Sequence, residues 1–374
     1  MNPGNTALKI SPARQHTLVV VFLRGGADGL NMVVPIGDDG YYRARPLIGV
    51  SKQDTVPLND LFGLHNALGP LQRAYGDGEL LVVHGAGSEE DSRSHFEAQD
   101  YMEHGGAGAG GWLGRYLRQN TRAANNPLAA IALGKRSPES LRSSPATVVM
   151  DSLEDIALGG EASAFLGGLD QLYRHSPLPW AKAGGDLLGA MRQVESLRAA
   201  PYQAAPGVNY PQDPFAQHLR QVAQLVKAEV GVEAITLDLD GWDSHFASTA
   251  LMNPLMTRLS EGLTAFYDDL GTFYRSRTTV VVMSEFGRRV YENASLGTDH
   301  GRGGVMLLLG GGVRGGRVMA DWPGLEKANL EGPGDVPVRY NYRDVLAPVF
   351  LRHQPEIELN QIFPAYTLNP LDVF

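Results

Sequence analysis

The sequence predicts an α/β protein, namely a three-layer α/β/α sandwich with a mostly parallel central sheet and a helical insertion. Short apolar runs that end in glycine or polar residues alternate with segments of helical periodicity, which is typical of parallel sheets covered by helices. The 374 residues are 43 % hydrophobic and 20 % charged, the composition of a core-forming chain. Glycine accounts for 45 of the 374 residues, about 12 % against the usual ~7 %, and this excess needs a local explanation.

The alternation begins near the amino terminus. Residues 16–24 (HTLVVVFLR) and 79–84 (ELLVVH) are short apolar runs rich in β-branched residues, which predict buried strands. The segment 61–75, which Gly76 ends, and the segment 95–103 are predicted to be helices. The order strand, helix, strand, helix indicates parallel α/β organisation.

Residues 105–231 are predicted to be a mainly helical, cap-like segment inserted into a single domain that spans residues 1–374. The segment starts with a glycine-rich tract and contains two short strand-like runs, 128–133 and 146–150. Its clearest helix has apolar residues at spacings of 4, 3 and 4 on one face, namely Phe215, Leu219, Val222 and Val226.

After this segment the alternation resumes. Residues 234–239, 278–283 and 305–309 are predicted strands, and the apolar face between Leu255 and Phe273 predicts a helix between the first two. These runs end in polar or glycine-rich residues. Open α/β sheets place their sites at the carboxyl ends of strands, and glycine lets backbone pass close to whatever binds there.

Charge and composition argue against several classes of protein. The formal net charge of 32 − 41 = −9 disfavours a nucleic-acid partner, which usually requires a basic face. The absence of cysteine rules out disulfides, iron–sulfur clusters and thiol nucleophiles. The longest purely apolar stretch, residues 18–23, is far shorter than the ~18 residues of a membrane span. Residues 1–12 lack a signal-peptide core, so the protein is either cytosolic or exported by a leader absent from this chain.

Polar residues gather where the predicted strands end. They form five groups: Asp28 and Asn31; Ser92 to His95; Asp240, Asp243 and His245; Ser284, Glu285 and Arg288; Asp299 and His300. Carboxylates and imidazoles without thiolates suit a divalent cation such as zinc, manganese, magnesium or calcium. The joint pattern therefore predicts a metal site at the carboxyl edge of the sheet.

Each group taken alone has a simpler explanation. An Asp after a strand often caps a helix or forms a turn, and Ser94 is well placed to cap the helix that starts at His95. Asp243 and His245 could form an Asx-type turn with a hydrogen-bonded histidine. Glu285 could be a loop carboxylate paired with Arg288.

Five ordered segments resemble the signature blocks of the bacterial family called domain of unknown function 1501. They are LRGGADGLN, SRSHFEAQDYMEHG, DGWDSHF, SEFGR and GTDHGRGG, and the resemblance extends over nearly the whole chain. The family is grouped with the alkaline phosphatase and sulfatase superfamily, whose members hydrolyse phosphate or sulfate esters at one or two metal ions. Its members commonly carry a twin-arginine leader, so the resemblance implies a periplasmic or otherwise exported protein, with a cytoplasmic location left open.

The resemblance also implies roles for individual residues. Ser94 resembles the nucleophile, and Arg93 together with Arg288 or Arg302 would hold the substrate anion. The metal ligands implied are Asp28, Asp243, His245, Glu285 and His300, to which the strand-end pattern adds Asp299. Two departures stand out. The usual Asp-x-x-x-His spacing is Asp243-x-His245 here, and Phe286 occupies the position where a histidine is expected.

The leading prediction is thus a metal-dependent hydrolase of phosphate or sulfate esters with a serine nucleophile and one or two divalent ions. Its expected substrate is a small-molecule or polysaccharide ester. A non-catalytic, exported binding or assembly protein on a degenerate phosphatase-like fold is the alternative, which Phe286 motivates. A phosphotransferase that passes the phosphoryl group to an acceptor other than water is a third possibility.

Overall fold

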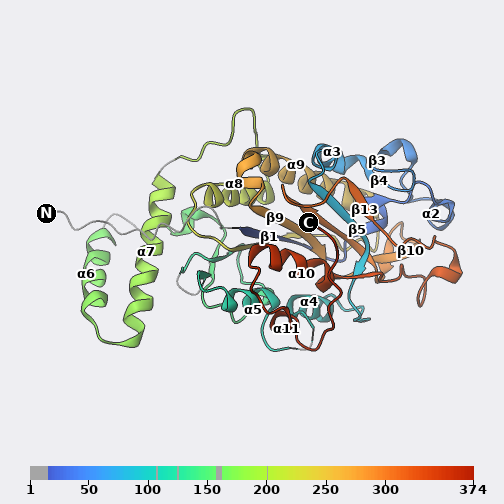
Figure 1. Cartoon of the computed structure of the whole chain (residues 1–374). Helices are drawn as coiled ribbons and strands as arrows, with labels where there is room; N and C mark the ends of the chain where they lie inside the picture. Colours follow the sequence, from blue (N-terminus) through green and yellow to red (C-terminus); the bar gives the residue numbers. More distant parts are fainter. Residues whose placement is uncertain (1–15, 107, 124–125, 157–161, 200) are drawn as a thin grey trace.

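A nine-stranded sheet forms the middle layer of the molecule (Figure 1). The computed structural model describes residues 16–106, 108–123, 126–156, 162–199 and 201–374. In spatial order the sheet strands are β13 (Arg317–Met319), β5 (Leu80–Gly87), β12 (Gly304–Leu309), β9 (Thr278–Ser284), β1 (Thr17–Arg24), β8 (Ala234–Asp240), β6 (Ala130–Leu133) and β7 (Val148–Met150); β14 (Tyr340–Asn341) also pairs with β5. All of them run in one direction except β12, which is antiparallel to both of its neighbours.

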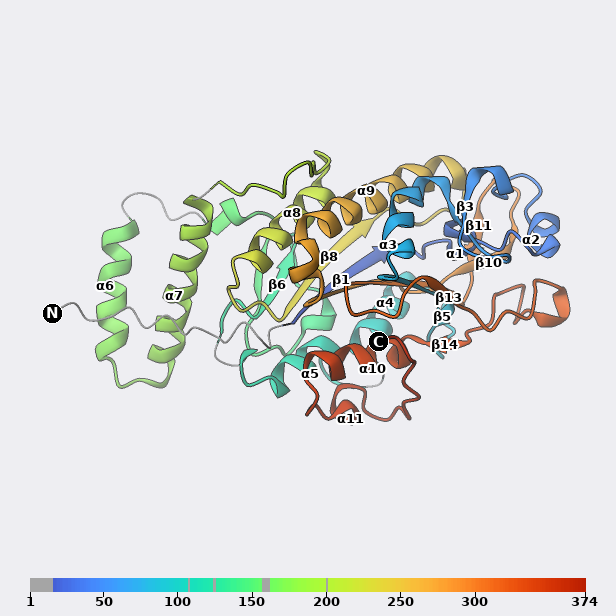
Figure 2. The ribbon, with the colours of Figure 1, turned by 45° about the horizontal axis from the view of Figure 1, so that its top comes forward.

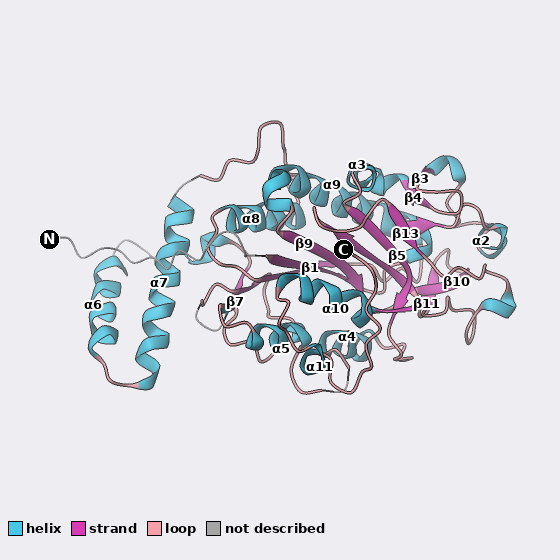
Figure 3. Cartoon of the chain, viewed as in Figure 1, coloured by secondary structure: helices cyan, strands magenta, loops and turns pink. Residues whose placement is uncertain are grey.

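Helices cover both faces of this sheet (Figure 3), so the three-layer α/β/α prediction is confirmed. One face packs against η3 (Asn66–Leu71), α3 (Gln72–Gly76), α8 (Pro214–Lys227) and α9 (Ser248–Arg275). The other packs against α4 (His95–His104), α5 (Trp112–Gln119), α10 (Tyr342–His353) and α11 (Leu359–Ile362).

The sequence of strand β1 is continuously apolar because both faces of the strand are buried. Its residues alternate between the two cores: Val19, Val21 and Leu23 belong to one, and Leu18, Val20 and Phe22 to the other. A strand with both faces buried has no solvent side on which polar residues could alternate.

Smaller elements surround the carboxyl edge of the sheet. One three-stranded sheet consists of β2 (Val33–Val34), β4 (Gly63–His65) and β3 (Thr55–Pro57), and a two-stranded sheet consists of β10 (Arg288–Glu292) and β11 (Thr298–His300). The short helices are α1 (Gly29–Met32), α2 (Asp39–Ala44), η2 (Lys52–Asp54), η5 (Glu139–Leu141), η6 (Leu153–Ile156) and η7 (Lys327–Asn329).

The strands predicted at 16–24, 79–84, 128–133, 146–150, 234–239, 278–283 and 305–309 all appear, as do the helices at 95–103 and around Phe215 and Leu255. The helix predicted over 61–75 is wrong in its first part. Residues Gly63–His65 form β4, and a 3-10 segment containing Pro70 precedes a short α3. Gly63 fits there because β4 lies between β2 and β3, where a Cβ on it would be 3.0 Å from Thr55.

Within residues 105–231, β6 and β7 extend the central sheet, while α5 and α8 cover its two faces. Helices α6 (Ala162–His175) and α7 (Pro179–Ala199) form a pair beside the sandwich (Figure 2). The division into one domain, 1–374, with an insertion at 105–231 stays a prediction. In the ranges that the structure describes, the helices are all too short or too polar to cross a bilayer.

His84 in β5 is a structural residue. Its Nε2–H donates to the carbonyl of Val33 at 3.2 Å, and its ring stacks on Phe62 and meets the edge of Trp322. Complete burial lowers the pKa of His84 to about 4, although the hydrogen bond to Val33 acts in the opposite direction.

We expect His84→Phe to reduce the loss of unfolding free energy that occurs as pH falls from 7 to 4.5. Because the pKa of His84 is lower in the folded state, the unfolded chain takes up its proton first as pH falls below about 6.5. His84 should therefore cost the wild type about 2–3 kcal/mol of unfolding free energy between pH 7 and pH 4.5. Urea unfolding at both pH values measures the difference. His175→Phe, on an exposed helix end, is the control, and equal pH slopes for wild type and His84→Phe would contradict the assignment.

Candidate metal centre at the carboxyl edge of the sheet

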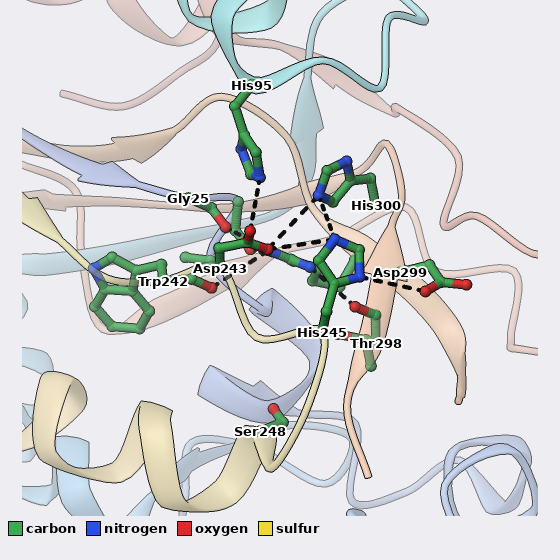
Figure 4. A network of polar contacts seen from close by, with 12 residues as sticks. Gly25, His95, Trp242, Asp243, His245, Ser248, Thr298, Asp299 and His300 are labelled. Carbon is green, nitrogen blue, oxygen red and sulfur yellow. Dashed lines mark hydrogen bonds and ion pairs between the residues drawn. The ribbon is translucent and has the colours of Figure 1, made fainter. Parts of the chain in front are cut away.

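Three neighbouring strands end at the candidate site. The loop after β8 carries Asp243 and His245, the turn after β9 carries Glu285, and Gly25 follows β1. His95 enters from the first turn of α4, and His300 from β11 (Figure 4).

Asp243 lies at the middle of this cluster. Its Oδ1 is 3.4 Å from His245 Nε2 and 3.7 Å from His300 Nε2, and its Oδ2 is 3.5 Å from His95 Nε2. The Nε2 atoms of His245 and His300 are 2.8 Å apart. The side chain of Asp243 is 49 % exposed, so a molecule in solution can reach the cluster.

The orientation of each imidazole is fixed by a contact of its Nδ1 atom, the ring nitrogen that points away from Asp243. Nδ1 of His95 lies 2.7 Å from Glu285 Oε1, Nδ1 of His300 lies 2.6 Å from the carbonyl of Arg93, and Nδ1 of His245 lies 3.4 Å from Asp299 Oδ1. An oxygen acceptor at Nδ1 favours the tautomer that carries its proton there. All three rings direct Nε2 toward Asp243, the arrangement that second-shell acceptors give to metal-binding histidines.

These residues fit a divalent cation. His95, Asp243 and His300 each offer a ligand atom within 4.8 Å of one another. Two ligands at about 2.0–2.1 Å from one ion lie about 2.9–3.4 Å apart at octahedral or tetrahedral angles. The separations here are close to those values. His95 Nε2 is also buried without a hydrogen-bond partner, a state that a buried polar nitrogen rarely tolerates.

Glu285 lies behind the cluster and not in it. Its Oε1 accepts hydrogen bonds from His95, from Gln99 Nε2 at 2.8 Å and from the amide of Gly25 at 2.9 Å. Burial would raise the pKa of Glu285, but the hydrogen bonds from His95 and Gln99 hold it below its usual value. In return, the hydrogen bond to Glu285 raises the pKa of His95 when no cation is bound. The predicted ligand Glu285 is thus a hydrogen-bond partner of His95.

Asp28, the predicted first ligand, is fully buried and bound by an arginine. Arg45 approaches both of its carboxylate oxygens, at 2.6 and 3.1 Å. Both oxygens are occupied because Arg45, at the end of α2, is itself 1 % exposed and needs a buried counter-charge.

The predicted anion-binding arginines are engaged inside the protein. Arg288 donates to the carbonyls of Gly25 and Gly26 and to Asp243 Oδ1, the last at 2.7 Å. Arg93 pairs with Asp335 at 2.6 Å and donates to the carbonyl of His300. The side chain of Arg288 is fully buried, whereas that of Arg93 is 35 % exposed. Their role in binding an anion stays a prediction.

Ser94 and Asp299 also have partners. Ser94 caps α4, with its Oγ accepting from the amide of Glu97 at 3.5 Å, as the simpler explanation of this residue requires. Its role as a nucleophile stays a prediction. Asp299 pairs with Arg289 at 3.1 Å and lies beside Nδ1 of His245, on the side away from Asp243.

The sequence analysis places His95 in one of the strand-end groups and at the start of a helix, but not among the predicted metal ligands. Its position directly after a helix-capping serine was the available signal, because the first turn of α4 points toward the strand ends. Phe286, the departure from the expected histidine, packs against both His95 and His300, with ring centroids 4.9 and 4.7 Å away, while those two rings are 4.3 Å from each other. The ring of Phe286 thus covers one side of the cluster.

Two glycines hold the loop that carries Asp243 and His245. A Cβ on Gly25, whose φ is +120°, would lie 2.5 Å from the amide nitrogen of Asp243. A Cβ on Gly297 would lie 2.3 Å from the carbonyl carbon of His245. Backbone therefore contacts this loop from both sides, at distances that only glycine permits.

A family model described as "Protein of unknown function (DUF1501)" matches residues 80–358. No curated protein matches the chain. Similar solved structures include Ps i-CgsB in complex with k-i-k-neocarrahexaose, at 12 % identity over 93 % of this chain and 74 % of that one, with a TM-score of 0.37. Others are the PH0037 protein from Pyrococcus horikoshii (12 %, 92 % and 98 %, TM-score 0.37) and BT1596, a 2-O GAG sulfatase (11 %, 82 % and 66 %, TM-score 0.32). These similarities are too remote to indicate an activity.

We expect Asp28→Asn to lower the unfolding free energy by about 3–5 kcal/mol, because it leaves the buried Arg45 without its counter-charge. The metal content of the folded protein should not change. Chemical unfolding and elemental analysis measure the two quantities, with the exposed Asp39→Asn as control. Loss of metal with little loss of stability would return Asp28 to the set of ligands.

Proposed function

We propose that this chain, which belongs to the DUF1501 family of proteins of unknown function, is a metal-dependent hydrolase of phosphate or sulfate esters. One observation carries the proposal: three histidines, each with an oxygen acceptor at Nδ1, direct Nε2 toward a single exposed carboxylate. The substrate is a small-molecule or polysaccharide ester, and the protein works outside the cytoplasm.

His95, Asp243, His245 and His300 hold the cation in this proposal. A donor set rich in imidazole favours zinc or manganese over calcium and magnesium. A divalent cation bound there supplies Lewis-acid polarisation of an ester oxygen.

The remaining residues position this group. Glu285 orients His95, and the carbonyl of Arg93 orients His300. Arg288, whose charge opposes the effect of burial, holds the pKa of Asp243 below its usual value, so Asp243 stays ionised at neutral pH. Phe286 packs against the rings of both His95 and His300 and so helps to hold them in place.

Ser94 is the proposed nucleophile. It precedes His95 at the N-terminus of α4, where backbone N–H groups favour an anion. Its Oγ forms a bond to phosphorus or sulfur, the bond to the ester oxygen breaks, and the serine proton ends on the leaving alcohol. Water then adds to phosphorus or sulfur and returns a proton to the serine as the phosphate or sulfate leaves. Ser92 provides a matched comparison, because its hydroxyl donates to Glu97 Oε2 at 2.5 Å one turn away.

A non-catalytic binding protein remains the second candidate. The observation that favours it is the internal engagement of the two arginines: Arg288 is buried and donates to Asp243, and Arg93 already binds Asp335 and the carbonyl of His300. Stoichiometric metal without turnover of any phosphate, phosphodiester or sulfate ester would select this candidate.

We expect Asp243→Asn and His300→Ala to lower the affinity for zinc or manganese at least about 10-fold, because the first replaces a charged ligand with a neutral one and the second removes a ligand. Glu285→Gln, which removes only the charge behind His95, should lower it about 10–100-fold. Elemental analysis and competition with a chelator measure these affinities. His175→Ala is the control, and unchanged metal binding in all three variants would refute the site.

We expect Ser94→Ala to lower turnover of an aryl phosphate or sulfate at least about a thousand-fold with metal content preserved, since the nucleophile is lost. Ser92→Ala should retain turnover within a few-fold. The reverse pattern would transfer the nucleophile to Ser92, and full activity in both variants would exclude a serine mechanism.

A further inference from the structure

A second buried carboxylate lies behind the histidine cluster. Asp335, in the segment between β13 and β14, is 0 % exposed. The backbone on either side of it is held by hydrogen bonds of 2.9 Å. The amide of Val290 in β10 donates to the carbonyl of the preceding residue, and the amide of Gly303, just before β12, donates to that of the following residue. Asp335 is thus fixed against the segment from β10 to β12, which carries His300.

One oxygen of Asp335 holds Arg93, and Arg93 holds His300. Oδ2 of Asp335 accepts from Nη2 of Arg93 at 2.6 Å. The other terminal nitrogen of Arg93, Nη1, donates to the backbone carbonyl of His300 at 2.5 Å, while the backbone carbonyl of Arg93 lies 2.6 Å from Nδ1 of the His300 ring. Arg93 therefore contacts both the main chain and the imidazole of His300, and Asp335 keeps the side chain of Arg93 in place.

The other oxygen of Asp335 faces a second arginine. Oδ1 lies 4.0 Å from Nε of Arg289, and neither atom has a hydrogen-bond partner within the described parts of the chain. Nη1 of Arg289 pairs with Oδ2 of Asp299 at 3.1 Å, and Oδ1 of Asp299 lies 3.4 Å from Nδ1 of His245 (Figure 4). The attraction between Asp335 and Arg289 therefore favours the position of Asp299 that orients His245.

The charge of Asp335 also matters for a bound cation. Arg93 and Arg289 place two positive charges next to the histidines that would bind it. A fully buried carboxylate that faces both guanidinium groups offsets part of this charge. Without Asp335, the guanidinium that binds the carbonyl of His300 would be an uncompensated positive charge beside a divalent cation.

We propose that Asp335 is a positioning residue of the candidate metal centre, which orients His300 and His245 through the two arginines. Glu285 has the same role for His95, but by direct contact. Each imidazole of the centre then depends on a buried carboxylate behind it, and one of the two carboxylates serves two rings. The cation in this inference rests on the proposed function, whereas the hold on the two rings does not.

The test compares two carboxylates that are equally buried and that each pair with a cationic side chain. Asp335→Asn keeps the size of the side chain but removes its charge, so the hold on Arg93 weakens. The affinity for zinc, measured by competition with a chelator, should fall about 10-fold, the low end for loss of a contact that supports a metal ligand.

The matched control is Asp269→Asn. The side chain of Asp269 is also 0 % exposed and pairs with Lys227, but it lies on α9, about 30 Å along the helix from the end that follows His245. Asp269→Asn should lower stability and leave the zinc affinity within about two-fold of the wild type, because the two sites are far apart. Equal zinc affinities in Asp335→Asn and Asp269→Asn would overturn the inference.

A second pair of variants keeps the test decisive if Asp335→Asn does not fold. Arg93→Gln combined with Asp335→Asn replaces the ion pair by two amides that can hydrogen-bond to each other, so no buried charge is left unpaired. This double variant should also lose about 10-fold in zinc affinity. Lys227→Gln combined with Asp269→Asn should keep it, and equal affinities in the two double variants would contradict the positioning role.

Failure of this inference and failure of the proposed function give different results. Long-range proton–nitrogen NMR spectra of the metal-free protein report the tautomer of each imidazole. Asp335→Asn should shift the ring-nitrogen signals of His300 and His245, whereas Asp269→Asn should leave them unchanged. If the wild type binds no metal or hydrolyses no ester while these signals shift, the positioning role stands without the hydrolase. Unchanged signals in Asp335→Asn would overturn the positioning role, even if the wild type hydrolyses aryl esters.

Discussion

The buried carboxylate of Glu285 is the constraint on which the candidate site depends. A charge removed from water must be hydrogen-bonded, and Glu285 meets this requirement with donors from three other places in the chain: the turn after β1, the first turn of α4 through His95, and Gln99 one turn later. Satisfying one carboxylate thus fixes the distance between β1, β9 and α4, and it also sets which nitrogen of His95 faces Asp243. The same hydrogen bonds therefore hold these three elements together and orient His95 in the candidate site.

The sequence was sufficient for most of the fold, because a strand buried on both faces has to be a continuous apolar run, as β1 and β9 are. It was less informative at 61–75, where apolar residues suited a helix but Gly63 and Pro70 favour a strand and a 3-10 turn. Helical periodicity alone does not distinguish the two when the segment is short.

At the site, the sequence correctly predicts that Asp243, His245 and His300 lie at one edge of the sheet. Asp243 and His245 follow a strand that ends there, and His300 precedes a strand that begins there. It does not show which neighbour satisfies each carboxylate. Asp28 is bound by Arg45, which belongs to no motif, and Glu285 is bound by His95 and Gln99 on a helix. A strand-end carboxylate can thus be recognised from sequence, while its role as ligand, ion-pair partner or orienting acceptor depends on contacts between distant segments.

The reversed direction of β12 determines how the last histidine reaches the centre. Because β12 is antiparallel to β9, it begins at the edge where its neighbours end, so the segment just before it, with Asp299 and His300, must cross the site. His300 thus lies in the segment that leads into β12, whereas Asp243 and His245 lie in the loop that follows β8. The β9–β12 connection is also held away from the centre, because Arg45 donates to the carbonyl of Val290 and Glu292 accepts from the amides of Leu47 and Ile48. A change in the length of this connection would therefore displace His300 together with the packing around α2.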